Sequence, residues 1–233
     1  DMDALPIQEE TGRDFASTHP GVMHACGHDS HMAMALVAAT VMNRIKDRLR
    51  GSIKFVFQPA EEGPGGAAPM IDSGVLENPT VDFALGCHIW PNIAEGTIGI
   101  RSGPLMASMF RFDITIKGKG GHGAMPHLCV DALETGSQVV GALQRIVSRH
   151  MDPLSPSVIT IGQFNAGSAF NVIPEIATLA GTARTFDRSV WKSWPSRIES
   201  VVKGVCDAMG ADYEISFEQG YPPTVNDPGM SET

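Results

Sequence analysis

The stretch MFRFDITIKGK, residues 109–119, marks a change of architecture along this chain. Its apolar side chains occupy every second position, with polar ones between them, which is typical of an antiparallel strand with one buried face. Downstream, apolar residues recur at helical spacing over residues 131–149 and 195–209, which predicts two amphipathic helices. Three further strands are expected at residues 157–165, 175–186 and 213–217. The order β-α-β-β-α-β predicts four antiparallel strands with two helices on one face.

Upstream of this stretch, short apolar segments alternate with helical ones. Residues 31–49 predict a helix that is buried at its start, and residues 67–73 predict a short second helix. Strands are expected at residues 52–58, 81–88 and 96–100. Such alternation favours an α/β layer with a largely parallel sheet. We therefore predict an α/β domain over residues 1–106, an inserted α+β domain over residues 107–219, and a return to the first domain over residues 220–233.

Composition and charge exclude several classes of function. The 233 residues are 42% apolar and 18% charged, as in a compact globular protein. Acidic residues outnumber basic ones, 26 to 17, and no basic stripe offsets the formal charge of −9, so a nucleic-acid partner is not expected. The longest apolar run, around residues 33–42, is too short to cross a membrane. Four cysteines without a CxxC pair indicate reduced thiols and a cytoplasmic protein: Cys26, Cys87, Cys129 and Cys206.

The segment HACGHDSH, residues 24–31, is the densest cluster of metal-ligand side chains in the chain. Three histidines, one cysteine and one aspartate lie within its eight residues, at the entry to a predicted helix. Imidazole and thiolate together favour Zn, Mn, Co or Ni over Ca or Mg. The alternative interpretation is a polar helix start, in which Asp29 or Ser30 is the cap and the histidines are solvated.

Two further segments place polar side chains at the ends of predicted strands. Glu61 and Glu62 follow residues 52–58, and His88 ends residues 81–88. Ligands in α/β sheets gather at the carboxyl ends of the strands. Adjacent carboxylates suit a division of labour, in which one binds metal and its neighbour moves protons. Taken singly, the glutamates would be a surface pair and the histidine would be structural, but the three clusters together predict a binuclear metal site.

Together with residues 86–91 and 118–127, these motifs resemble the M20 metallopeptidase/amidohydrolase family. Within it, the match is to the hippurate hydrolase-like branch of N-acyl-amino-acid and auxin-conjugate hydrolases. The opening DMDALP, residues 1–6, matches the start of that branch's motif series. The resemblance implies a zinc-peptidase-like α/β catalytic domain with an inserted dimerisation or lid domain. It also implies metal-dependent cleavage of the amide bond between an acyl or aroyl group and an amino acid.

The resemblance further implies a role for each matching position. Two divalent ions per subunit, Mn or Zn with Co and Ni as alternatives, would be bound by Cys26, His28, Glu62 and His88. Glu61 would be the general acid/base that takes a proton from a metal-activated water and passes it to the departing amine. His122 would cross to the active site of the partner subunit in a homodimer and donate to the oxyanion. The substrate carboxylate would be bound by Asn171 and Arg184.

Simpler roles stay open for some of these residues. In a purely structural interpretation, His122 caps a loop and Arg184 forms a cross-strand ion pair. His31 is expected to be an outer partner of the ligands or a structural residue. An apolar acyl pocket is suggested by Met106, Met109 and Phe170.

Two alternative functions follow from the same residues. Members of this family continue past the lid domain, and that stretch supplies a further histidine ligand. Because the chain starts at Asp1 without Met and stops at Thr233, we expect a piece truncated at both ends that lacks one ligand. One alternative is therefore a catalytically incomplete module that only dimerises, through an edge strand at residues 109–119. The other is a thiol amidase in which Cys26 is the nucleophile and a nearby histidine is the base.

Overall fold

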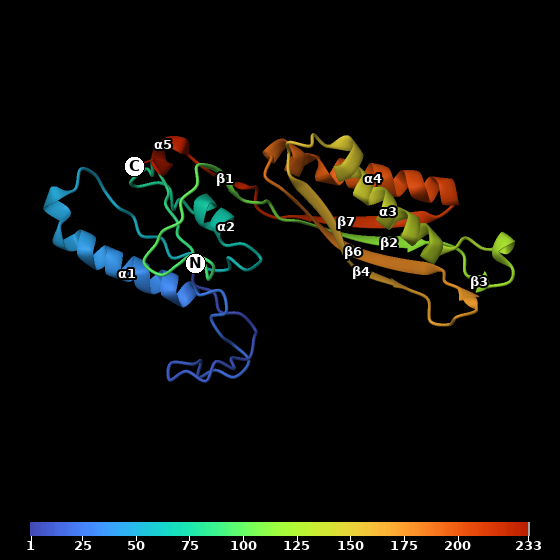
Figure 1. Ribbon diagram of the computed structural model, residues 1–233, viewed down its shortest axis with the longest axis horizontal. Helices are drawn as coiled ribbons and strands as arrows, with labels where there is room; N and C mark the ends of the chain where they lie inside the picture. The colour runs from blue at the N-terminus through green and yellow to red at the C-terminus, as the bar shows by residue number, and fades with distance from the viewer. Residues whose placement is uncertain (233) are drawn as a thin grey trace. The chain divides into compact units, whose positions relative to one another are not determined.

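The computed structural model describes residues 1–232, and the chain divides into two compact units (Figure 1). The first unit is Asp1–Ile98, and the second begins at Gly99. The predicted division at residues 106 and 219 stays a prediction. Within residues 1–232, no helix combines the length and the apolar character that a membrane span requires.

The second unit is built on a four-stranded antiparallel sheet. Its strand order is β4-β6-β2-β7, with β2 at Phe110–Lys117, β4 at Ser157–Ala166, β6 at Ile176–Thr185 and β7 at Asp212–Gln219. Two helices, α3 (Ala132–His150) and α4 (Arg188–Met209), cover one face of the sheet (Figure 1). The predicted order β-α-β-β-α-β is therefore confirmed.

The alternating strand β2 lies in the interior of this sheet. Its even-numbered side chains are at most 1% exposed and form the centre of the core: Phe110, Phe112, Ile114 and Ile116. Strand β6 pairs with one side of β2 and β7 with the other along its whole length. The hypothesis that residues 109–119 form an edge strand is wrong, because both rows of backbone hydrogen-bonding groups are already paired. The edges of the sheet are β4 and β7.

Aspartate caps explain where the two long helices begin. The Asp131 carboxylate accepts hydrogen bonds from the N–H groups of Leu133 (2.9 Å) and Glu134 (3.1 Å), which starts α3. Asp187 caps α4 in the same way, through the N–H groups of Ser189 and Val190. Each cap satisfies N–H groups that have no partner inside the helix.

Helix α4 begins at Arg188, before the start predicted at Pro195. The helix runs through Pro195 without a break, so this proline does not mark its first turn. A proline inside a helix removes one hydrogen bond, here the one to the carbonyl of Trp191. Gln219 Nε2 donates to that carbonyl at 3.5 Å. A side chain from β7 thus takes the place of the missing backbone donor.

Smaller elements complete the second unit. Two short antiparallel pairs join β1 (Gly103–Met106) to β8 (Thr224–Asn226) and β3 (Gly121–His122) to β5 (Val172–Ile173). The 3-10 helix η2 (Pro126–Leu128) follows β3, and the short helix α5 (Pro228–Ser231) follows β8.

The first unit contains α1 (His28–Arg44), the 3-10 helix η1 (Lys46–Arg48) and α2 (Ala67–Asp72). Both predicted helices are therefore present. The expectation of regular strands at residues 52–58, 81–88 and 96–100 is wrong, since the described residues of this unit pair only at the isolated bridge between Leu5 and Met23. These segments are apolar yet exposed, as at Leu85 (86%). Extended backbone forms a sheet only where a neighbouring strand pairs with it.

Candidate metal centre

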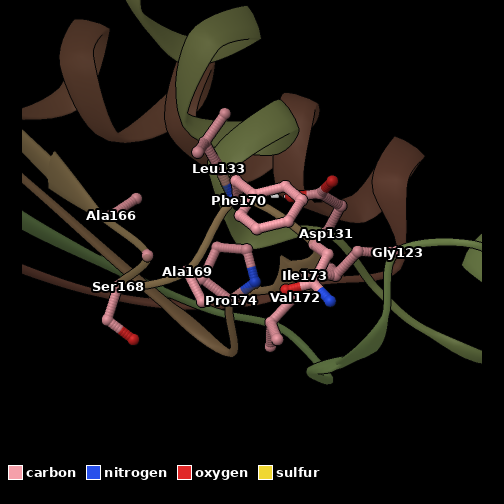
Figure 2. A pocket seen from close by; sticks show the side chains of 12 residues that line it. Gly123, Asp131, Leu133, Ala166, Ser168, Ala169, Phe170, Val172, Ile173 and Pro174 are labelled. Atoms are coloured by element: carbon pink, nitrogen blue, oxygen red, sulfur yellow. Dashed lines mark hydrogen bonds between the residues drawn. The ribbon is translucent and has the colours of Figure 1, made fainter.

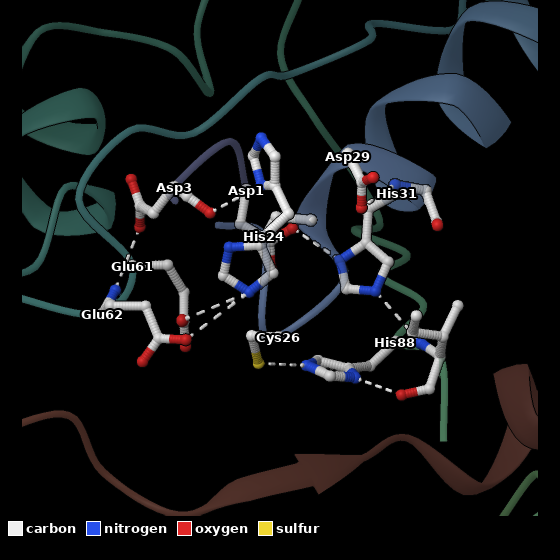
Figure 3. Close-up of polar contacts among 12 residues, drawn as sticks. Asp1, Asp3, His24, Cys26, Asp29, His31, Glu61, Glu62 and His88 are labelled. Carbon is white, nitrogen blue, oxygen red and sulfur yellow. Dashed lines mark hydrogen bonds and ion pairs between the residues drawn. The ribbon is translucent and has the colours of Figure 1, made fainter. Parts of the chain in front are cut away.

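Three segments of the first unit bring potential ligand atoms together. Cys26 lies in the loop before α1, His28 is the first residue of α1, and His88 lies in the extended segment after residue 80. Their ligand atoms all lie within 4.8 Å of one another. Cys26 Sγ and His88 Nε2 are 3.3 Å apart (Figure 3). The structure thus groups three of the four proposed ligands, and His88 comes from a segment sixty-two residues beyond Cys26 in sequence.

A glycine allows the loop before α1 to approach the segment that carries His88. Gly27 has φ 82°, a conformation that residues with a side chain rarely adopt. A Cβ at this position would lie 2.1 Å from Ile89 Cδ1. Gly27 lies between Cys26 and His28. The turn at this glycine therefore allows both side chains to point toward the same centre.

The imidazole of His28 shows that the site fits a metal ion. The side chain is fully buried, and within residues 1–232 neither ring nitrogen has a hydrogen-bond partner. Its Nε2 lies 3.6 Å from Asp1 Oδ2, 3.8 Å from Glu61 Oε2 and 3.9 Å from Glu62 Oε1. These separations are too long for hydrogen bonds. A buried nitrogen without a partner costs about 1–3 kcal/mol, and a cation among these donors would remove that cost.

His88 is oriented as a ligand would be. Its Nδ1 donates to the carbonyl of Ile89 at 2.6 Å, because a carbonyl only accepts. In the neutral ring, Nε2 therefore carries a lone pair, and this atom faces Cys26. Fixing the tautomer through the other ring nitrogen is typical of metal-binding histidines.

His31, by contrast, is already engaged at both ring nitrogens. Nδ1 donates to Asp1 Oδ1 at 2.7 Å, and Nε2 accepts from the N–H of Ile89 at 3.0 Å. Burial lowers the pKa of His31, and the neighbouring His88 and His28 lower it further, so the neutral ring is favoured. The ring nitrogens of His31 lie near other potential metal-ligand atoms. Both nitrogens are already used in hydrogen bonds, however, so His31 has no lone pair left for a metal ion.

The two glutamates lie side by side next to His28, and the distances alone do not separate their roles. The Glu61 side chain is 48% exposed and that of Glu62 is 33% exposed. Burial raises the pKa of the Cys26 thiol, and a hydrogen bond and negative charge from Glu62 raise it further. Glu62 is thus the carboxylate associated with Cys26, and Glu61 is the more open of the two.

Asp1 and Asp3 have no individual role predicted from the sequence, although both lie within the centre (Figure 3). Burial alone would raise the pKa of Asp3, but hydrogen bonds from the backbone N–H groups of Glu62, Ala60 and Glu61 lower it overall. The available signal was the spacing i, i+2 in an extended segment, which directs both carboxylates to one side.

In the second unit, the structure places His122 close to Asn171. Strands β3 and β5 pair His122 with Val172, and the N–H of Gly123 donates to the carbonyl of Asn171 at 2.9 Å. The N–H of Ala124 donates to His122 Nδ1 at 3.1 Å, so the neutral ring carries its proton on Nε2. His122 therefore has a donor available.

A cavity of about 520 Å³ lies beside this pair, and Gly123, Phe170 and Asn171 are among its lining residues (Figure 2). Of the three residues proposed for an apolar acyl pocket, Phe170 lines this cavity, whereas Met106 and Met109 do not.

Arg184 lies on β6, opposite Val158 of β4, and does not line this cavity. Its side chain is exposed, and among residues 1–232 no carboxylate lies within ion-pair distance of it. The cross-strand ion pair considered from the sequence is therefore absent from the described residues. The guanidinium remains available to a ligand.

The chain belongs to the peptidase family M20/M25/M40, whose description it matches over residues 1–233. It is 52% identical over 227 residues to the N-acyl-L-amino acid amidohydrolase of Geobacillus stearothermophilus, covering 97% of this chain and 61% of that protein. It is 43% identical to the N-acetyl-L-cysteine deacetylase of Bacillus subtilis strain 168, covering 99% of this chain and 55% of that protein. The chain therefore spans somewhat over half the length of these curated relatives.

Solved structures confirm the predicted α/β peptidase-like fold. A protein of methicillin-resistant Staphylococcus aureus has a TM-score of 0.89 at 40% identity, covering 99% of this chain and 59% of its own. The YXEP protein of Bacillus subtilis, described as a dinuclear metal-binding peptidase from the M20 family, has a TM-score of 0.81 at 37% identity. That match covers 99% of this chain and 58% of the YXEP chain.

Proposed function

We propose that this protein is a metal-dependent amidohydrolase that cleaves the amide bond of N-acyl amino acids. The observation that carries the proposal is the buried imidazole of His28, which has no hydrogen-bond partner among residues 1–232. It lies within reach of a thiol, a second imidazole and two carboxylates. The printed activities of the Geobacillus and Bacillus relatives, an amidohydrolase and a deacetylase, support this substrate class.

The proposed ligands of two divalent ions are Cys26, His28, Glu62 and His88. Mixed sulfur, nitrogen and oxygen donors suit Zn or Mn, with Co and Ni as alternatives. The dinuclear site of the YXEP protein supports the number of ions. When bound, such ions lower the pKa of water and polarise an amide carbonyl.

Glu61 is the proposed general acid/base. Its carboxylate lies next to His28 but is not hydrogen-bonded to it, and half of its surface is open. A carboxylate in such a position can take a proton from the attacking water and then deliver it to the departing amine nitrogen. The neighbouring Glu62, associated with Cys26, would serve as a metal ligand.

The second unit is proposed to supply the remaining groups. His122 would donate from Nε2 to the oxyanion, and its available donor supports this role. Asn171 and Arg184 would bind the substrate carboxylate. The guanidinium of Arg184 has no ion-pair partner in the described part of the chain and suits bidentate binding. We also propose a homodimer, in which His122 serves the active site of the partner subunit.

The distance of 3.3 Å between Cys26 Sγ and His88 Nε2 also fits a thiol nucleophile with its base, which is the second candidate function. However, burial and the neighbouring glutamates raise the pKa of Cys26, which disfavours the thiolate that a nucleophile needs. Replacing Cys26 by Ser separates the two functions. If Cys26 is the nucleophile, the Ser variant should be inactive at every metal concentration. If Cys26 is a metal ligand, the Ser variant should regain activity as metal is added.

The proposal is tested by assaying hydrolysis of a panel of N-acyl amino acids by the whole protein, with and without a chelator. Glu61→Gln should abolish turnover while the bound metal is retained. Glu10→Gln, the same change at an exposed position, is the matched control and should match the parent. Turnover that resists the chelator, or full activity of Glu61→Gln, would contradict the proposal.

A further inference from the structure

Asp3 has no part in the proposed chemistry, although its side chain lies inside the candidate metal centre. Residues 1–5 alternate between half-buried and exposed, as in an extended segment that turns every second side chain inward. Leu5 and Met23 exchange two backbone hydrogen bonds of 2.8 and 3.1 Å, and His24 Nδ1 donates to the carbonyl of Asp3 at 3.0 Å. The backbone of Asp3 is therefore fixed to the segment just before α1.

Each oxygen of the Asp3 carboxylate accepts a hydrogen bond from a backbone N–H group. Oδ1 accepts from Ala60 at 2.6 Å. Oδ2 accepts from Glu62 at 3.0 Å (Figure 3). These two residues flank Glu61, so the backbone on either side of Glu61 is held by a charge-assisted hydrogen bond. Ala60 has φ 56°, an uncommon conformation for a residue with a side chain, which such contacts help to maintain.

The Glu61 side chain itself is only loosely held. Its contact with His28 Nε2, at 3.8 Å, is longer than a hydrogen bond. A group that must accept and release a proton needs freedom from tight partners, yet it must stay within reach of the reacting atoms. Fixing the backbone on both sides meets both requirements.

We propose that Asp3 is a positioning residue that holds the backbone of residues 60–62 and thereby directs the Glu61 carboxylate. This inference rests on the proposed function. Asp3, His28 and Glu61 also form a group that could itself hold a metal ion. Both oxygens of Asp3 accept backbone N–H groups and so hold the loop directly. A ligand role would use the lone pairs that remain, and the number of ions bound separates the two roles.

The test compares Asp3→Ala, Asp3→Asn and Asp14→Asn in the whole protein, where Asp14 is an exposed aspartate of the same unit. At saturating Co²⁺, kcat for an N-acyl amino acid should fall roughly 10- to 100-fold in Asp3→Ala. KM and the number of Co²⁺ ions bound per chain should stay at the parental values. Asp3→Asn keeps one accepting oxygen, so its kcat should lie between those of Asp3→Ala and the parent. The kcat of Asp14→Asn should match that of the parent.

Several outcomes would overturn the inference. Loss of a bound Co²⁺ ion in Asp3→Ala would make Asp3 a ligand, and parental kcat in Asp3→Ala beside an inactive Glu61→Gln would show that the loop needs no such support. If Asp3→Ala fails to fold by circular dichroism, Asp3→Asn decides the question by the same two readouts. An active Glu61→Gln variant would overturn the proposed function and this inference with it.

Discussion

The histidines of the candidate metal centre differ in what their ring nitrogens contact. Within residues 1–232, His28 has no hydrogen-bond partner at either nitrogen, and His88 uses Nδ1 for a carbonyl and presents Nε2 to a thiol. His31 uses both nitrogens, one for Asp1 and one for the N–H of Ile89. Three histidines that look alike in sequence thus divide into two ligand candidates and one support, by hydrogen bonding alone.

We expect His31→Gln to weaken metal binding. Because His31 links Asp1 to the backbone next to His88, its loss would free the segment that orients this ligand. Changes of this kind cost roughly 10- to 100-fold in metal affinity. Competition with a chromogenic chelator measures the affinity, and His19→Gln, at an exposed position, is the control. Equal affinities for His31→Gln and the parent would refute this role.

Residue types and spacing were sufficient to predict which side chains gather at the centre, since thiol, imidazole and paired carboxylates are uncommon in such density. They were not sufficient for Asp3, whose partners are the backbone N–H groups of Ala60 and Glu62. Every residue except proline has such a group, so the sequence does not identify the partners of Asp3, even though the i, i+2 spacing places Asp1 and Asp3 on one side of an extended segment.

At the scale of secondary-structure elements, the cap of α4 makes a pH-dependent contribution to stability. The Ser189 hydroxyl and the N–H groups of Val190 and Ser189 hydrogen-bond the Asp187 carboxylate and lower its pKa. The stabilisation is therefore complete above the ordinary aspartate pKa of about 3.9, and it is lost as the pH falls through the lower folded-state pKa.

Asp187→Ala should lower the free energy of unfolding by about 1 kcal/mol at neutral pH. The difference from the parent should shrink as the pH approaches about 3, because the carboxylate becomes protonated. Urea unfolding followed by circular dichroism measures both values. Asp187→Ser keeps a capping oxygen without a titrating group, so its stability relative to Asp187→Ala should not follow this pH dependence. A gap between Asp187→Ala and the parent that stays constant with pH would contradict the assignment.

Packing inside the sheet gives a second prediction at this scale. A Cβ at Gly181 of β6 would lie 2.3 Å from Phe112 Cζ and 2.6 Å from the carbonyl oxygen of Thr160. Gly181→Ala should therefore destabilise the protein by about 1–3 kcal/mol. Gly162→Ala, on the neighbouring strand β4, has open space around its added methyl and serves as the control. The prediction fails if the two variants unfold at the same urea concentration.

Elements with a strong apolar periodicity were predictable from the sequence. Features that depend on contacts with segments distant in sequence were not. The alternation of β2 fixed its type, but its interior position follows from pairing with β6 and β7, which are distant in sequence. Pro195 misled the prediction of the α4 start, because the compensating donor, Gln219, comes from another strand. The extended segments of the first unit have strand-like composition without a paired neighbour in the described residues.

At the scale of the whole molecule, we expect metal binding to raise the thermal stability of the protein. Ions that bind only the folded state stabilise it by about 2.7 kcal/mol at a hundredfold excess over Kd. Addition of Zn²⁺ or Mn²⁺ to chelator-treated protein should therefore raise Tm, and Cys26→Ser should reduce the shift. Cys87→Ser, an exposed cysteine outside the proposed ligand set, should retain it. A Tm that does not respond to metal would argue against the centre.

The proposed exchange of His122 between subunits makes the dimer itself testable. Glu61→Gln and His122→Ala should each be inactive as homodimers. In a mixed dimer, however, the site of the His122→Ala subunit has an intact Glu61. It receives the intact His122 of the Glu61→Gln subunit. If the variants are unfolded and refolded together, random pairing should restore about one quarter of the parental activity. Refolding each variant alone is the control. If His122 serves its own chain, mixing restores nothing, and light scattering then shows whether a dimer is present at all.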